Sequence, residues 1–130
     1  MEWMISRRLV EDHTGVEVMI GLSRPIQLES GDWSCAFTTD QGSPECARQA
    51  HGVDELQALL LAIEGLHMTL SRSGRCLTWL GEPGDTGVPR PSPLMFGLAF
   101  RQRVERMIEL ELEQVAEEHR ERFERRRPEG

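Results

Sequence analysis

Alternating hydrophobic and polar residues at the start of the chain predict a β-hairpin. Residues 3–12, WMISRRLVED, alternate around Trp3, Ile5 and Leu9, and residues 15–22, GVEVMIGL, are rich in β-branched residues. Residues 12–15 supply turn chemistry between the two segments. Because the link is short, the two segments are expected to pair as antiparallel strands.

Further strands are expected on either side of a helix. The segment WSCAFTT (33–39) predicts a third strand and RCLTWL (75–80) a fourth, while DQGSPE (40–45) predicts a loop. The more polar CARQAH (46–51) could add a short strand. Alternation gives the third strand two faces, one of them directed to the core. The core face carries Trp33, Cys35 and Phe37, and the other face Ser34, Ala36 and Thr38.

The segment HGVDELQALLLAIEGLHMTL (51–70) predicts an amphipathic helix. Asp54 and Gln57 have capping-box spacing, so the helix is expected to begin at Asp54, and Ser73-Gly74 is expected to end it. The apolar stripe is flanked by more apolar residues, which predicts burial on more than one side. The stripe comprises Leu56, Leu59, Leu60, Ile63, His67 and Leu70.

A proline- and glycine-rich connector precedes a second, longer helix. Residues 81–93, GEPGDTGVPRPSP, contain four of the seven prolines and cannot form regular helix. Residues 94–127 contain no proline, and their apolar residues recur at near-helical spacing. This helix is expected to pack partly on the same layer as the first, with residues 128–130 as a tail.

The predicted fold is a single α+β domain over residues 1–127. It has a mostly antiparallel sheet of about four strands in the order β-β-β-α-β-α, a central buried helix and a long C-terminal helix. A chain of 130 residues with 38% hydrophobic content fits one globular domain.

Charge and composition narrow the classes of partner. The net charge of −7 repels phosphate backbones and anionic lipid and favours a basic partner. No apolar stretch reaches the roughly 18 residues of a membrane span. Three cysteines, an odd number, in a chain without an export signal predict reduced thiols in the cytoplasm. We therefore expect neither nucleic acid nor membrane as a partner.

Catalytic and metal-binding patterns are weak. Cys35, Cys46, Cys76 and His51 lack the close pairs of a zinc site, and no third group marks Cys46 or Cys76 as a nucleophile. His67 is interpreted as a core or boundary imidazole with one satisfied hydrogen bond. We expect no catalytic residue, metal or cofactor, with a thiol or metal enzyme as the less favoured alternative.

The last helix carries sorted charges. Arginines crowd its C-terminal end, where they complement the helix dipole. Its middle is acidic, which is typical of a solvated face but also suits a surface for a basic protein. The middle contains Glu105, Glu109, Glu111, Glu113, Glu117 and Glu118.

Three segments resemble a group of small bacterial proteins of unknown function: DWSCAF (32–37), GVDELQALLLAI (52–63) and LTWLG (77–81). The group has a W-x-C strand and a G-x-D-x-x-Q-A-L-x-L-A helix, and the resemblance covers roughly residues 3–90. Similar small acidic proteins occur as immunity proteins beside polymorphic toxins, which implies a binding role. A looser likeness is to the HicB-type antitoxin domain, whose usual DNA-binding continuation the acidic last helix does not resemble.

The expected function is therefore that of a non-catalytic, immunity-type inhibitor that binds a basic toxin or effector. Its alternative is a homodimeric structural protein that pairs through the long helix. Acidic residues near the connector and on the last helix would speed encounter, and apolar anchors would supply affinity. The predicted partner-binding residues are Trp79, Glu82, Asp85, Met95, Phe96, Glu105, Glu109 and Glu113.

Overall fold

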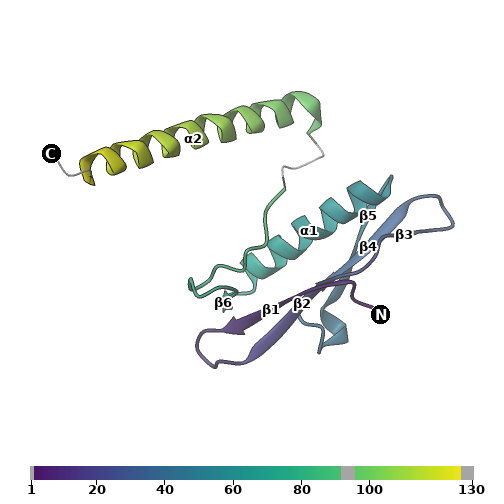
Figure 1. Ribbon diagram of the computed structural model, residues 1–130. Helices are drawn as coiled ribbons and strands as arrows, with labels where there is room; N and C mark the ends of the chain where they lie inside the picture. Colours follow the sequence, from purple (N-terminus) through teal and green to yellow (C-terminus); the bar gives the residue numbers. More distant parts are fainter. Residues whose placement is uncertain (1, 92–95, 127–130) are drawn as a thin grey trace. The chain divides into compact units, whose positions relative to one another are not determined.

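The computed structural model describes residues 2–91 and 96–126 (Figure 1). The chain forms two compact units, Met1–Pro91 and Ser92–Gly130, called unit 1 and unit 2. Unit 1 contains the strands β1 (Ile5–Glu11), β2 (Glu17–Leu22), β3 (Ile26–Gln27), β4 (Trp33–Thr38), β5 (Ala47–Gly52) and β6 (Leu77–Thr78), a 3-10 turn (Pro44–Cys46) and helix α1 (Glu55–Arg72). Unit 2 contains helix α2 (Gly97–Arg126). The single domain over residues 1–127 stays a prediction.

The sheet of unit 1 is antiparallel throughout and is built around β4. β5 pairs with β4 along residues 33–38, while β2 and then β3 pair with parts of the same strand. Because a strand has only two edges, β2 and β3 share the edge opposite β5, separated by the break at Arg24-Pro25. β1 pairs with β2, and β6 pairs with β1.

The α+β class and the antiparallel sheet are confirmed, but the prediction of about four strands is wrong. The structure has six strands. β3 and β6 have two residues each, too few for any periodic pattern, and the strand predicted over 75–80 is reduced to β6. The short strand suggested over CARQAH (46–51) forms as β5, shifted by one residue to Ala47–Gly52.

Helix α1 begins where its capping residues predict. The Asp54 carboxylate accepts a hydrogen bond from the Gln57 backbone N–H at 2.8 Å. The Gln57 side chain reaches back and accepts from the Val53 N–H at 2.7 Å, one residue before the expected cap. Two otherwise unpaired donors are satisfied in this way, which fixes the entry to the helix.

The buried face of α1 shares Leu70 with the predicted stripe, and its other residues come from the apolar residues expected to flank that stripe. Leu56, which belongs to that stripe, is 63% exposed. The residues that face the sheet recur every four positions and begin with small side chains, because α1 approaches the sheet closely. They are Ala58, Ala62, Leu66 and Leu70.

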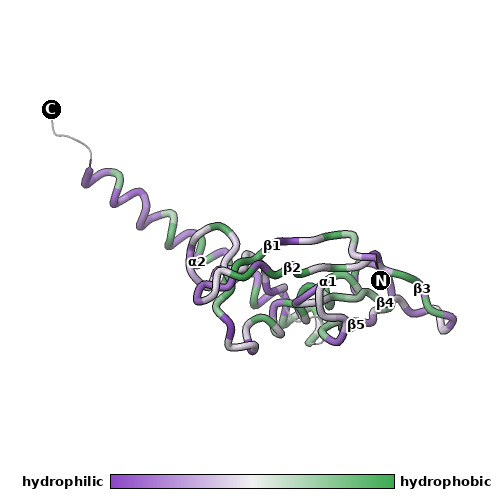
Figure 2. The backbone as a smooth tube through the Cα atoms, turned by 90° about the horizontal axis from the view of Figure 1, so that it is seen from below, coloured by the Kyte–Doolittle hydropathy of each residue, from purple (hydrophilic) through white to green (hydrophobic). Residues whose placement is uncertain are grey.

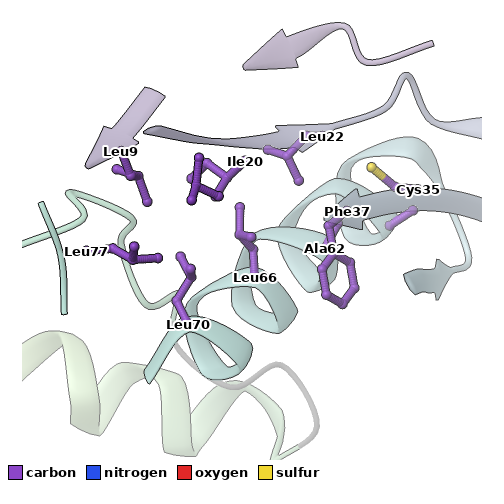
Figure 3. Close-up of a cluster of buried hydrophobic side chains, with 11 residues drawn as sticks. Leu9, Ile20, Leu22, Cys35, Phe37, Ala62, Leu66, Leu70 and Leu77 are labelled. Carbon is purple, nitrogen blue, oxygen red and sulfur yellow. The ribbon is translucent and has the colours of Figure 1, made fainter. Parts of the chain in front are cut away.

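The core of unit 1 lies between α1 and one face of the sheet (Figure 3). Leu66 of α1 points toward Ile20 and Leu22 of β2, and Leu77 of β6 closes one end beside Leu9. Glycines permit this close packing. A Cβ on Gly65 would lie 2.6 Å from the Phe37 ring, and one on Gly52 would lie 2.5 Å from the Ala58 nitrogen.

The opposite face of the sheet holds the first tryptophan. Trp3 was expected to share a face with Leu9, but its ring lies over Gly21, whose neighbours Ile20 and Leu22 are buried on the α1 side. Trp3 precedes β1, so strand alternation does not extend to it. The predicted pattern therefore holds only within Ile5–Glu11.

Helix α2 has 30 residues, and none of its described side chains is buried. The predicted helix of residues 94–127 matches this position, although 94, 95 and 127 lie outside the described residues. Figure 2 shows hydrophilic and hydrophobic residues interspersed along it. Its packing on the layer of α1 stays a prediction. Neither α1 nor α2 is long and apolar enough to cross a membrane.

Candidate functional site

The predicted partner-binding residues divide between the two units. The end of unit 1 carries Trp79, which directly follows β6, and Glu82 and Asp85, which lie in the connector loop. Phe96 precedes α2 in unit 2, and the predicted Met95 lies outside the described residues. The remaining three, Glu105, Glu109 and Glu113, lie on α2.

The connector loop is fastened to the folded part of unit 1. The Arg7 guanidinium of β1 stacks on the Trp79 ring, 3.6 Å from its centroid. Arg7 Nη1 also donates a hydrogen bond to the Thr86 carbonyl at 3.2 Å. From α1, His67 Nδ1 lies 3.0 Å from the Val88 carbonyl and must carry the proton, since a carbonyl only accepts. These contacts hold a proline- and glycine-rich loop in one conformation.

Asp85 stabilises the loop from within. Its carboxylate accepts from the Gly87 N–H at 2.8 Å, and its carbonyl accepts from the Trp79 N–H at 2.9 Å. Gly87 has a φ of +67° and lies so close to Trp79 that a Cβ would overlap the ring. Trp79 is 40% exposed, which leaves part of its ring available to a partner. Binding by Trp79, Glu82 and Asp85 stays a prediction.

Sequence patterns did not identify Arg7 or the Val88 carbonyl as parts of this arrangement. A signal for Arg7 exists: alternation with Leu9 places it on the core side of β1, where a charge is unusual. No sequence signal marks the Val88 carbonyl, because its contact with His67 spans 21 residues. The single hydrogen bond expected for His67 is confirmed.

A second cluster of polar side chains joins the β1–β2 turn to β6. The Asp12 carboxylate accepts hydrogen bonds from the Cys76 thiol at 2.6 Å and from the Thr78 hydroxyl at 2.7 Å. These bonds lower the pKa of Asp12. The hydrogen bond to Asp12, followed by desolvation and the Asp12 charge, raises the pKa of Cys76. Cys76 is thus held as a thiol, which disfavours nucleophilic attack.

Replacing Asp12 with asparagine should make Cys76 more reactive. Asp12→Asn removes the negative charge beside the thiol, so the Cys76 pKa falls and more thiolate forms at mildly alkaline pH. Iodoacetamide alkylation followed by peptide mass spectrometry measures the rate. Cys46, the other partly exposed thiol, is the internal control and should react as before. An unchanged Cys76 rate would show that Asp12 does not control this thiol.

The thiol of Cys35 is also poorly placed for reaction. Cys35 is buried in the core, and desolvation raises its pKa. Within the described ranges, no group of three or more histidine, cysteine or acidic side chains could hold a metal ion. The four residues considered for zinc therefore do not come together as a metal site.

On α2, an acidic row lies beside an apolar row. Glu105, Glu109 and Glu113 recur every four residues and so follow one side of the helix. The apolar row precedes each glutamate by one position and consists of Val104, Ile108 and Leu112. Ile108 is 50% and Leu112 64% exposed.

The fold and the fastened loop define unit 1 as a small α+β domain with an antiparallel sheet covered on one face by a helix. The chain belongs to the family described as Domain of unknown function (DUF6968), whose model matches residues 5–90. No curated protein and no solved structure matches the chain. The match ends one residue before the end of unit 1, so residues 81–90 of the connector belong to the family domain and α2 lies outside it.

Proposed function

We propose that this protein is a non-catalytic protein-binding module and that α2 binds its partner. One observation carries the proposal: α2 has 30 residues with no buried side chain among those described, yet it has large apolar residues on its surface. A helix with an apolar row is normally stabilised by packing that row against another surface. The exposed apolar residues of α2 are Leu98, Met107, Ile108, Leu110, Leu112, Val115 and Phe123.

The charge of α2 supports a basic partner. Between Glu109 and Glu118 the helix carries five glutamates and no lysine or arginine. A groove that takes the apolar row of Val104, Ile108 and Leu112 would meet these carboxylates at its rim. Basic residues at the rim would pair with them, and such charge complementarity accelerates association.

Within this class, an immunity-type inhibitor of a basic toxin or effector is the most concrete proposal. An exposed and acidic element such as α2 suits binding to a basic protein by charge complementarity. The hydrogen-bonded thiol of Cys76 weighs against the alternative of a thiol enzyme, because a raised thiol pKa leaves less of the reactive thiolate.

The homodimer remains the alternative, since the same apolar row could pack on a second copy. The five glutamates argue against it. Two α2 helices paired in parallel register, or antiparallel about their middles, would bring two acidic segments side by side. Like charges at that distance repel. Light scattering of the purified chain separates the two proposals, because a dimer that persists on dilution would favour self-association.

Charge reversal on α2 tests the proposed partner. With the basic protein recovered by affinity capture from the native cell, Glu109→Lys combined with Glu113→Lys should slow association by about tenfold at low salt, because electrostatic steering is lost. Stopped-flow or surface-based kinetics measures the rate.

The matched control is Glu2→Lys combined with Glu29→Lys, which changes the net charge equally on exposed residues of unit 1. It should leave most of the steering intact. Equal slowing of association by both double variants would mean that only the net charge matters. An unchanged association rate for the α2 double variant would exclude α2 as the binding element. Capture of no basic protein would contradict the proposal itself.

A further inference from the structure

Unit 1 contains a pocket that opens toward its core. The cavity has a volume of about 170 Å³ and lies where β1 and β2 meet α1 and the end of the connector loop. Three of its lining residues, Ile20, Leu22 and Leu66, are at most 8% exposed and belong to the core. The pocket therefore reaches the hydrophobic interior from the surface.

The lining is mainly apolar, and its polar residues are Ser6 and Arg7. Ile63 of α1 and Val88 and Pro89 of the connector add aliphatic walls, and Arg7 is the charged residue among those that line the pocket. An apolar space of this kind does not hold water well, and a cavity of about 150 Å³ lined by similar side chains accommodates benzene. The space therefore suits one aromatic ring or a branched aliphatic group.

Arg7 lacks an acidic partner in an acidic protein. The chain has 22 acidic residues against 15 basic ones, yet no ion pair in the described part of the chain includes Arg7. By contrast, the neighbouring Arg8 pairs with Glu17 at 3.6 Å. A partly buried guanidinium without a carboxylate is well suited to bind an anion.

The position of the guanidinium is fixed before any ligand arrives. One face of Arg7 stacks on Trp79, and Nη1 donates to the Thr86 carbonyl. Within the described part of the chain, this is the single hydrogen bond made by the five N–H donors of the guanidinium. The loop that carries Thr86 and Val88 is itself held by His67. Such preorganisation reduces the entropy lost on binding.

We propose that this pocket binds a carboxylate that carries one aromatic ring or a branched aliphatic group. The carboxylate pairs with Arg7 and the apolar group enters the space beside Leu66 and Val88. A free carboxylic acid and the C-terminus of a peptide that ends in an apolar residue share this chemistry. The site is in the family domain and does not depend on binding by α2.

The test is an NMR titration of the ¹⁵N-labelled full chain with 3-phenylpropionate and, separately, with its uncharged amide. We expect saturable shifts around Arg7 and Val88 with the acid, at concentrations up to about 10 mM, and much weaker shifts with the amide. N-acetyl-Gly-Gly-Phe and its C-terminal amide form the peptide arm. Tighter binding of the peptide acid would identify a peptide terminus as the source, and binding of phenylpropionate alone a small acid.

Variants test the charged part and the apolar part of the pocket separately. Arg7→Met keeps the apolar stem and should weaken binding of the acid by about tenfold, the usual loss for one charge-assisted hydrogen bond. Arg8→Met is the matched control: it removes the same charge from the next residue, which alternation places on the other face of the sheet, and should bind as the wild type does. Ile63→Phe should fill the space and reduce binding of both acid and amide.

If Arg7→Met does not fold, Arg7→Lys keeps the charge without the planar guanidinium, and it should still prefer the acid to the amide. The proposal is overturned by equal binding of acid and amide, by wild-type affinity in Arg7→Met, or by the absence of any saturable shift in the wild type.

Discussion

Gly52→Ala is expected to destabilise unit 1 by about 3 kcal/mol or more, because the added methyl has no space. Its Cβ would lie 2.5 Å from the Ala58 nitrogen and 2.9 Å from the Gln57 carbonyl carbon. Both are backbone atoms of the first turns of α1, so relief requires the helix to move away from β5. Urea unfolding followed by circular dichroism measures the free energy of unfolding.

Gly42→Ala is the control for Gly52→Ala. There the new Cβ would meet only an oxygen of the Asp40 side chain, at 3.2 Å, in an exposed loop. We expect a change within about 0.5 kcal/mol, as is usual for a surface substitution. Equal stability of the Gly52 variant and the wild type would mean that β5 and α1 are not in the close contact described.

Leu66→Ala is expected to cost about 3 kcal/mol, since truncating a buried leucine removes its transfer free energy and leaves a cavity. Leu66 is 3% exposed and lies at the centre of the core (Figure 3). The same unfolding experiment measures the loss.

Leu56→Ala, on the same helix, provides the matched comparison. Leu56 is 63% exposed, so deleting the same atoms should change the free energy of unfolding by about 0.5 kcal/mol or less. A large loss at Leu56 with a small one at Leu66 would favour the stripe predicted from periodicity over the buried face in the structure.

The contrast between these two leucines shows what hydrophobic periodicity cannot decide. Apolar residues surround most of α1, so a spacing of three and four residues fits several faces equally well. In the structure, α1 packs the face with the small residues Ala58 and Ala62 against the sheet. This is possible because the glycines at 52 and 65 allow the strand backbone and the Phe37 ring to approach the helix closely. That selection depends on residues distant in sequence.

Elements with strong local signals were predicted well. The Asp54 cap, the β1–β2 hairpin and the long last helix each depend on neighbours along the chain. The two-residue strands β3 and β6 depend on pairing with β4 and β1, and they have no pattern of their own. Of the candidate sites, the acidic row on α2 could be predicted from spacing, while the pocket at Arg7 could not, since it joins four separate segments.

The family domain begins and ends at one place. Ile5 at the start of the family match and Pro89 near its end line the same pocket, although they lie near opposite ends of the matched sequence. A domain with adjoining ends can be appended to, or inserted into, another polypeptide without disturbing its sheet. The adjoining ends therefore let a further segment, such as α2, be joined to the module without interrupting its sheet.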